Sequence, residues 1–309
     1  MEKIKEVGGQ AVIEGVMMRS PEFISVAIRR TNGEIFVKRD PYVALTKRFK
    51  FLNIPIIRGV IVLIETLYIG VKTLMFSADE AMKEISPEAK EKKSEGGFLN
   101  SLWIFLMVIL GVGLGVLIFF YLPLVFTDLL RIKGSLLFNL VDGVIRLTIF
   151  LLYIYLISLW KDMRRVFEYH GAEHKSIYTL ESGRELTVEN AKEHSTLHPR
   201  CGTSFLLIVV IVSILVFMFL GRPHTFTDRL IRLSFIPLIA GISYELIKLS
   251  GRKMDSRLAK ILTAPGLWLQ RITTKEPDEK QLEVAIASLK SALNLPSGEA
   301  EAGEQDSSQ

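Results

Sequence analysis

The sequence predicts a mainly α-helical, polytopic membrane protein with about four transmembrane helices, an amphipathic or interfacial helix and a small N-terminal antiparallel β-sheet. Hydrophobic residues make up 49% of the 309 residues, and the mean hydropathy of +0.33 is high for a soluble chain of this length. The apolar residues gather in long runs that charged segments separate. Four of the five histidines and the single cysteine lie together between two of these runs. A polar segment rich in possible ligands is therefore expected beside a membrane domain.

Four apolar runs are long enough to cross a hydrocarbon core of about 30 Å. In chain order they are residues 101–126, 136–160, 202–221 and 230–249. The first has no charged residue, and the last has charged residues near its ends, where long side chains can reach the interface. We expect a four-helix membrane domain over residues 101–249, interrupted by a His/Cys loop over residues 161–202.

Residues 1–50 are predicted to form a small β domain. Strands are expected over residues 11–18, 23–29 and 34–38, because β-branched and apolar residues are frequent there. The Asn32-Gly33 pair suits a tight hairpin turn between the last two strands. The first ten residues lack the apolar stretch of a signal peptide, so we expect this domain to be solvated and not secreted.

Residues 51–78 are apolar but differ from the four spans. Charged side chains recur there and just beyond at intervals of seven, on one side of a helix: Arg58, Glu65, Lys72 and Asp79. Such a stripe predicts a helix that lies in the interface or packs against other helices. A fifth crossing here would also put the N-terminal sheet on the side opposite to the basic loops. The charged residues 79–100 are predicted to be a linker.

The distribution of Lys and Arg predicts the orientation, because short basic loops stay in the cytoplasm. Residues 161–200 contain seven Lys and Arg, whereas the connections 127–135 and 222–229 contain two each. The His/Cys loop and both termini are therefore expected to be cytoplasmic. The net charge of +5 is modest and lies in loops beside apolar runs, so the expected partner is the lipid bilayer and not nucleic acid. A homo-oligomer remains open.

The C-terminal region, residues 250–295, is predicted to contain interfacial and amphipathic helices. Trp268 and Arg271 are typical of an interfacial anchor. Pro277 suits the first turn of the amphipathic helix that follows. The small, acidic residues 296–309 are predicted to be a disordered tail.

His170 and His174 stand four residues apart, so on a helix both imidazoles project from one face. Glu173 lies between them, and the order His-x-x-Glu-His is that of inverted zinc hydrolases, in which the glutamate handles the proton of a metal-bound water. His198 and Cys201, three residues apart beside a proline and a glycine, form the second half of a metal site. Using one member of this pair leaves a ligand position open, as a catalytic zinc requires, whereas using both closes the site.

Other interpretations of these residues stay open. His194 fits a surface position, and His224 falls on the opposite predicted side of the membrane. Cys201 could act as a nucleophile with His198 as its base, although such pairs are normally distant in sequence. Ionisable side chains in apolar segments are candidates for function, here Glu65 and Glu245. Glu245 could instead form a salt bridge with Lys248 or Arg252.

Four blocks of the sequence resemble the YqhQ-like family of bacterial membrane proteins, over about residues 7–289. The blocks are GGQAVIEGVMMR at residues 8–19, YHGAEHK at 169–175, HPRCGTSF at 198–205 and PGLWLQ at 265–270. The resemblance implies a multi-pass protein of the bacterial inner membrane and a metal-dependent enzyme without a known substrate. It supports metal binding by the histidines and the cysteine. It also implies that the block with Glu14, Met17 and Arg19 folds over the His/Cys loop from the cytoplasmic side.

The leading hypothesis is an integral membrane, zinc-dependent hydrolase with its site at the cytoplasmic face. His170 and His174 would bind the metal, His198 or Cys201 would complete the ligand set, and Glu173 would be the general base. An amide or ester bond near the membrane surface is the expected target.

Two rival functions remain. In the first, the same four ligands hold a structural metal in a non-enzymatic scaffold or assembly factor. In the second, Glu65, Asp142 and Glu245 line the pathway of a transporter.

Overall fold

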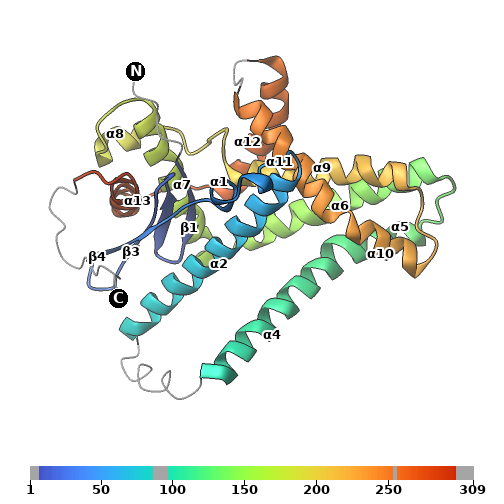
Figure 1. The fold of residues 1–309 in the computed structure, drawn as a ribbon, viewed down its shortest axis with the longest axis horizontal. Coiled ribbons are helices and arrows are strands. Elements are labelled where there is room, and N and C mark those ends of the chain that lie inside the picture. Colours follow the sequence, from blue (N-terminus) through green and yellow to red (C-terminus); the bar gives the residue numbers. More distant parts are fainter. Residues whose placement is uncertain (1–6, 86–96, 253–255, 297–309) are drawn as a thin grey trace.

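The computed structural model describes residues 7–85, 97–252 and 256–296. The protein is mainly helical, and Figure 1 shows two parts side by side: a β-sheet with its covering helices, and a bundle of long helices. Residues 297–309, predicted to be a disordered tail, lie outside the described residues.

The N-terminal sheet has four antiparallel strands in the order β1-β2-β3-β4. They are β1 (Gly8–Val12), β2 (Gly15–Arg19), β3 (Phe23–Arg29) and β4 (Ile35–Pro41). The predicted hairpin turn at Asn32-Gly33 is confirmed, and Gly33 has a φ of 90°.

The single strand predicted over residues 11–18 is wrong, because a hairpin turn divides it into β1 and β2. Val12 pairs with Gly15, so Ile13 and Glu14 form the turn, and Glu14 has a φ of 52°. A Cβ on Gly15 would lie 2.1 Å from the Ala27 carbonyl oxygen, so only glycine fits there. The turn has no Asn-Gly or Asp-Gly signal and lies inside an apolar run, which concealed it.

Three helices from two later regions of the chain share one hydrophobic core with the sheet. The helices are α7 (Lys161–Glu181), α8 (Val188–Lys192) and α13 (Glu279–Ala292). Buried core residues include Val16, Met18, Ala27, Tyr169, Ala172, Leu282, Ala285 and Leu289. α13 begins at the Asp278 cap, whose side chain accepts a hydrogen bond from the Gln281 backbone N–H. We call the sheet with these helices the extramembrane domain.

The bundle contains the four predicted spans. α4 (Gly97–Val116), η2 (Leu117–Tyr121) and α5 (Leu122–Leu129) follow one another without a break. η2 and α5 pack against α6 (Ser135–Ser158), which in turn packs against α9 (Gly202–Leu220). The fourth span consists of two helices, α10 (Phe226–Ser234) and α11 (Ile236–Arg252). The division precedes Pro237, which cannot donate a backbone hydrogen bond to the preceding turn.

The helix α2 (Ile57–Ile85) is a fifth candidate span. Within the described residues, five helical stretches are long and apolar enough to cross a membrane: Ile57–Ala81, Leu106–Leu129, Ser135–Ser158, Gly202–Leu220 and Phe226–Leu249. The linker predicted over residues 79–100 is wrong at its start, because α2 continues to Ile85, and at its end, because α4 begins at Gly97. Glu80 lies on this continuation and forms a 2.6 Å ion pair with Arg30, which ties it to the sheet.

Chain connectivity distinguishes α2 from the bundle helices. The sheet, α7 and α13 share a core and so lie on one side of the membrane. Between the sheet and α7 the chain passes through α4–α5 and α6, and between α7 and α13 through α9 and α10–α11. If these four spans cross, the chain returns to the same side only when α2 does not cross. The beginning of α2 packs against α11, and its later part contacts the sheet, where Ile13 N donates to Ser77 Oγ at 3.2 Å.

Two short elements precede α2, namely α1 (Leu45–Arg48) and η1 (Lys50–Leu52). After the bundle, α12 (Arg257–Thr273) packs against α9, and a Cβ on Gly266 would lie 2.0 Å from Ser204 Oγ. This close crossing brings the end of α12 to the beginning of α9. The boundary between the bundle and the extramembrane domain is built there.

Candidate metal centre

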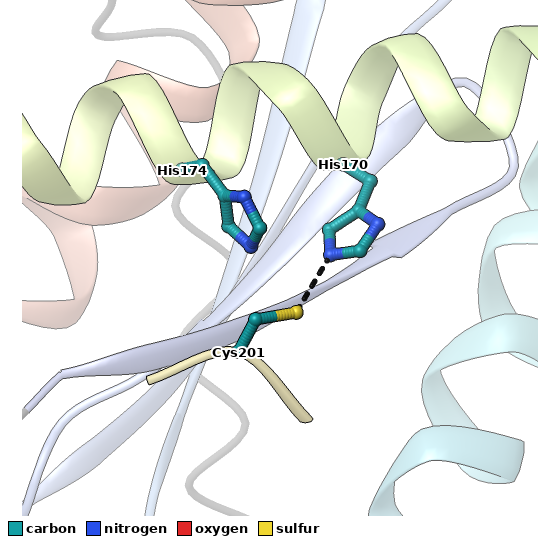
Figure 2. Close-up of side chains that lie close together, drawn as sticks. All are labelled: His170, His174 and Cys201. Atoms are coloured by element: carbon teal, nitrogen blue, oxygen red, sulfur yellow. Dashed lines mark hydrogen bonds between the residues drawn. The ribbon is translucent and has the colours of Figure 1, made fainter. Parts of the chain in front are cut away.

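His170 and His174 project from one face of α7, as their spacing predicts. Figure 2 shows both imidazoles directed toward Cys201, which lies on the segment that leads into α9. His170 Nδ1 lies 2.8 Å from the Thr273 carbonyl oxygen. Because a carbonyl oxygen only accepts, Nδ1 carries the proton and Nε2 carries the lone pair. That Nε2 lies 3.2 Å from Cys201 Sγ.

His174 is oriented in the same way. Its Nδ1 donates to the Thr196 carbonyl oxygen, so its Nε2 also carries the lone pair. That Nε2 is buried and makes no hydrogen bond of normal geometry within the described part of the chain. The ligand atoms of His170, His174 and Cys201 all lie within 4.8 Å of one another.

Burial and the dipole of α9 affect the charge state of the residues in this cluster. Burial lowers the pKa of His174, and the neighbouring Cys201 opposes this shift. A neutral imidazole is the form that binds metals. Cys201 is the N-cap of α9, where its sulfur accepts from Thr203 N at 3.4 Å. The positive end of a helix dipole favours a negatively charged group at this position.

His198 does not join the cluster. Its Nε2 lies 3.4 Å from the Glu181 carboxylate, and its Nδ1 accepts from Arg200 N at 3.3 Å. Its ring packs edge-on against Tyr178, with the centroids 4.5 Å apart. Of the two residues predicted to complete the ligand set, the structure brings Cys201 to the two histidines on α7.

Gln270 fixes the backbone of His198 from both sides. His198 N donates to Gln270 Oε1 at 2.7 Å, and Gln270 Nε2 donates to the His198 carbonyl at 2.9 Å. Gln270 is fully buried on α12. It therefore holds the turn that carries Cys201 against the end of α12.

Glu173 lies on the same helix but faces the sheet. It is buried, and a Cβ on Gly9 would come within 2.8 Å of its Cγ. Burial raises the pKa of Glu173, while His170, His198 and a hydrogen bond from the Gly9 backbone act in the opposite direction. A carboxyl whose pKa is raised toward neutrality suits proton transfer.

The other proposed site residues lie outside the cluster. Glu14 forms an ion pair with Arg165 on α7, and the Tyr169 hydroxyl donates to it at 3.4 Å, so the sheet block does meet α7. Arg19 contacts Thr66 of α2 at 3.5 Å. Neither residue belongs to the group of possible ligands.

The acidic residues considered for transport all have partners. Glu245 pairs with Arg58 of α2, a salt bridge that was not expected from the sequence. Asp142 pairs with Arg146 at 2.9 Å. Glu65 accepts a hydrogen bond from Leu45 N at 3.0 Å. His194, expected at the surface, stacks on the Tyr178 ring.

Several residues that build the centre were not identified from the sequence. The carbonyl groups of Thr196 and Thr273 have no sequence signal, because every residue carries one. Gly171 did offer a signal, since it stands between the two histidines. A Cβ there would lie 2.0 Å from the Lys275 carbonyl oxygen, so only glycine lets the segment that follows α12 approach α7 this closely.

Two imidazole nitrogens and one sulfur make a donor set suited to Zn²⁺, which binds nitrogen and sulfur ligands tetrahedrally. Three protein ligands leave one position for water or substrate. The Nδ1–H group of each histidine donates a hydrogen bond to a backbone carbonyl oxygen. Metal-binding histidines are usually oriented by such a hydrogen bond.

The chain matches the model of a family described as a protein of unknown function (DUF1385) over residues 54–295. It is also similar to the "Uncharacterized protein YqhQ" of Bacillus subtilis (strain 168). The two are 37% identical over 306 residues, which cover 93% of this chain and 92% of the relative. No solved structure matches.

Proposed function

The chain belongs to the DUF1385 family, and we propose that it is an integral membrane, metal-dependent hydrolase. The metal is zinc or another divalent transition metal, and His170, His174 and Cys201 bind it. The site faces the cytoplasm at the inner membrane of a bacterium, with both termini on the same side. The substrate carries an amide or ester bond and lies near the membrane surface.

One observation supports this proposal most directly. His174 Nε2 is a buried nitrogen that makes no hydrogen bond of normal geometry in the described structure, and it lies beside two further ligand atoms. A buried polar atom without a partner is costly, commonly about 1–3 kcal/mol. A cation bound between the three atoms removes that cost for His174.

The residues divide the chemistry between them. A bound zinc ion supplies a Lewis acid and lowers the pKa of a water to about 7. The carbonyl groups of Thr196 and Thr273 hold the two imidazoles so that their Nε2 lone pairs face Cys201. Glu173 would be the general base that takes a proton from the attacking water, and its raised pKa favours this role.

The proposed orientation of the protein in the membrane is argued from the distribution of Lys and Arg. The segment between the second and third spans is rich in Lys and Arg, and the connections at the other end of the bundle carry few. The lipid bilayer is the partner of the bundle in this proposal.

A structural metal is the second candidate function. It is favoured by burial, because His174 is 1% exposed and Cys201 is 9% exposed. A site closed to solvent stabilises a fold without turning over a substrate.

Metal content tests the part that both candidates share. The purified wild-type chain should bind one zinc per molecule by elemental analysis, and its cobalt form should show a sulfur-to-cobalt absorption band. His174→Ala should weaken zinc binding by at least about a hundredfold. His194→Ala is the matched control on a nearby histidine and should retain the metal. An unchanged metal content in His174→Ala would contradict the proposed site.

Glu173→Gln separates the two candidates. In the hydrolase this variant keeps its zinc and loses activity, which is measured by mass spectrometry of the products released when bacterial membranes are incubated with each protein. A typical general base contributes about 10²–10⁴-fold to the rate. Products released equally by wild type and variant, with His174→Ala equally active, would favour the structural metal.

A further inference from the structure

A partly open cavity of ≈ 290 Å³ lies where the bundle meets the extramembrane domain. The end of α6 lines it with Tyr155 and Leu159, and the beginning of α7 with Arg164. The end of α12 and the residues after it contribute Arg271 and Lys275. Apolar and cationic side chains therefore meet in one cavity at the boundary of the bundle.

The cavity carries an excess of positive charge. Arg164 has one acidic neighbour, Glu168, at 3.5 Å. Arg271 and Lys275 form no ion pair with any of the residues that the structure describes. Guanidinium groups bind phosphate oxygens through paired hydrogen bonds, and an ammonium group adds a point charge.

The depth of the cavity in the membrane is indicated by two tryptophans beside it. Trp160 follows the α6 residues in the sequence and is 66% exposed, and Trp268 lies one turn before Arg271 and is 50% exposed. Exposed tryptophans gather at the level of the lipid headgroups. Leu159, which is also largely exposed, continues the apolar surface toward the hydrocarbon.

We propose that this cavity binds the phosphate headgroup of an anionic membrane lipid. The phosphate lies between Arg164, Arg271 and Lys275, and the acyl chains follow the apolar end of α6. Basic cavities between membrane helices on the cytoplasmic side are suited to such headgroups. A soluble acidic peptide would not need the exposed apolar rim.

The cavity also borders the candidate metal centre. Lys275 N donates to the Phe167 carbonyl at 2.9 Å, and the Thr273 carbonyl holds His170. The segment 273–275 thus contacts both places. Lipid binding itself does not depend on the metal or on the proposed hydrolase.

Lipid binding is tested on the full-length chain in a neutral detergent by native mass spectrometry with added phosphatidylglycerol. The double variant Arg271→Gln/Lys275→Gln should bind this lipid about 25-fold more weakly, since each cation near a headgroup contributes about fivefold. Arg257→Gln/Lys260→Gln, on α12 but outside the cavity, removes the same charge and should change binding by less than about twofold. Arg164→Gln, on another helix, should weaken binding about fivefold.

Three results would overturn the proposal. They are an equal loss in both double variants, unchanged binding in Arg271→Gln/Lys275→Gln, and displacement of the lipid by inorganic phosphate at equal concentration, which would identify a free phosphate as the ligand. Phosphatidylcholine should bind more weakly than phosphatidylglycerol. His174→Ala should keep the lipid, so a failure of the metal proposal is distinguishable from a failure of this one.

Discussion

The extramembrane domain and the bundle each bury a cluster of polar side chains, but the two clusters differ in charge. In the bundle, Asp142 and Arg146 lie one turn apart on α6 and neutralise each other at 2.9 Å. In the extramembrane domain, His170, His174 and Cys201 bring two imidazole lone pairs and one thiol together, and that thiol can donate its single proton to only one of the two nitrogens. A membrane has no water to supply a counter-charge, so the bundle supplies its own. The other cluster, under our proposal, receives its cation from solution.

One close-packed glycine in each region shows two different kinds of contact. In the extramembrane domain, Gly171 faces a backbone carbonyl, that of Lys275. In the bundle, Gly143 on α6 faces the side chain of Ile214 on α9, with a Cβ position 2.4 Å from Ile214 Cγ1. A side chain can rotate or be shortened, whereas backbone cannot. The contact between Gly143 and Ile214 is therefore more easily adjusted than that between Gly171 and the Lys275 carbonyl.

Breaking the ion pair of the bundle should have the largest effect. Arg146→Met leaves the Asp142 carboxylate buried without its cation, and we expect a loss of about 3–5 kcal/mol in the free energy of unfolding. Asp142→Asn/Arg146→Met removes both charges and should recover part of that loss. Thermal unfolding in detergent measures both. An equal loss in the single and double variants would show that the pair is not the source.

Gly171→Ala, in the extramembrane domain, should have the second largest effect. The added methyl group forces the Lys275 carbonyl away from α7, at a cost of about 3 kcal/mol. Hydrogen exchange measured by mass spectrometry should become faster in α7 and at the end of α12, with α4 to α6 unaffected. Slow exchange in α7 of this variant would contradict the close approach.

Gly143→Ala should have the smallest effect of the three. Ile214 can move, so we expect a loss of about 1 kcal/mol. In an Ile214→Ala background the same substitution should cost almost nothing, because the opposing atoms are gone. Unfolding of the four proteins in a double-mutant cycle measures the coupling. A cost that persists without the isoleucine side chain would place the clash elsewhere.

Much of the fold follows from local patterns. Uncharged runs about 20 residues long predict spans whatever lies beside them, because the bilayer sets their length. The charged stripe of α2 predicts an interfacial or packed helix, and Arg58 on that stripe contacts another helix, at Glu245. The β1–β2 turn at Ile13 and Glu14 could not be predicted from local sequence. Gly15, which follows the turn, is required by its close packing against Ala27 of β3 and not by the turn itself.

The sequence by itself determined which residue types could bind a metal and that the spacing of His170 and His174 puts both rings on one face of a helix. Only the tertiary structure decided that Cys201, and not His198, has its ligand atom within 4.8 Å of both histidines, although the ring centroid of His198 lies 5.6 Å from that of His174. His198 faces Glu181 because Gln270 of α12 fixes its backbone, and that contact joins residues 72 positions apart. Spacing along a helix is set by local geometry, but the choice between two nearby ligands depends on packing that no short stretch of sequence encodes.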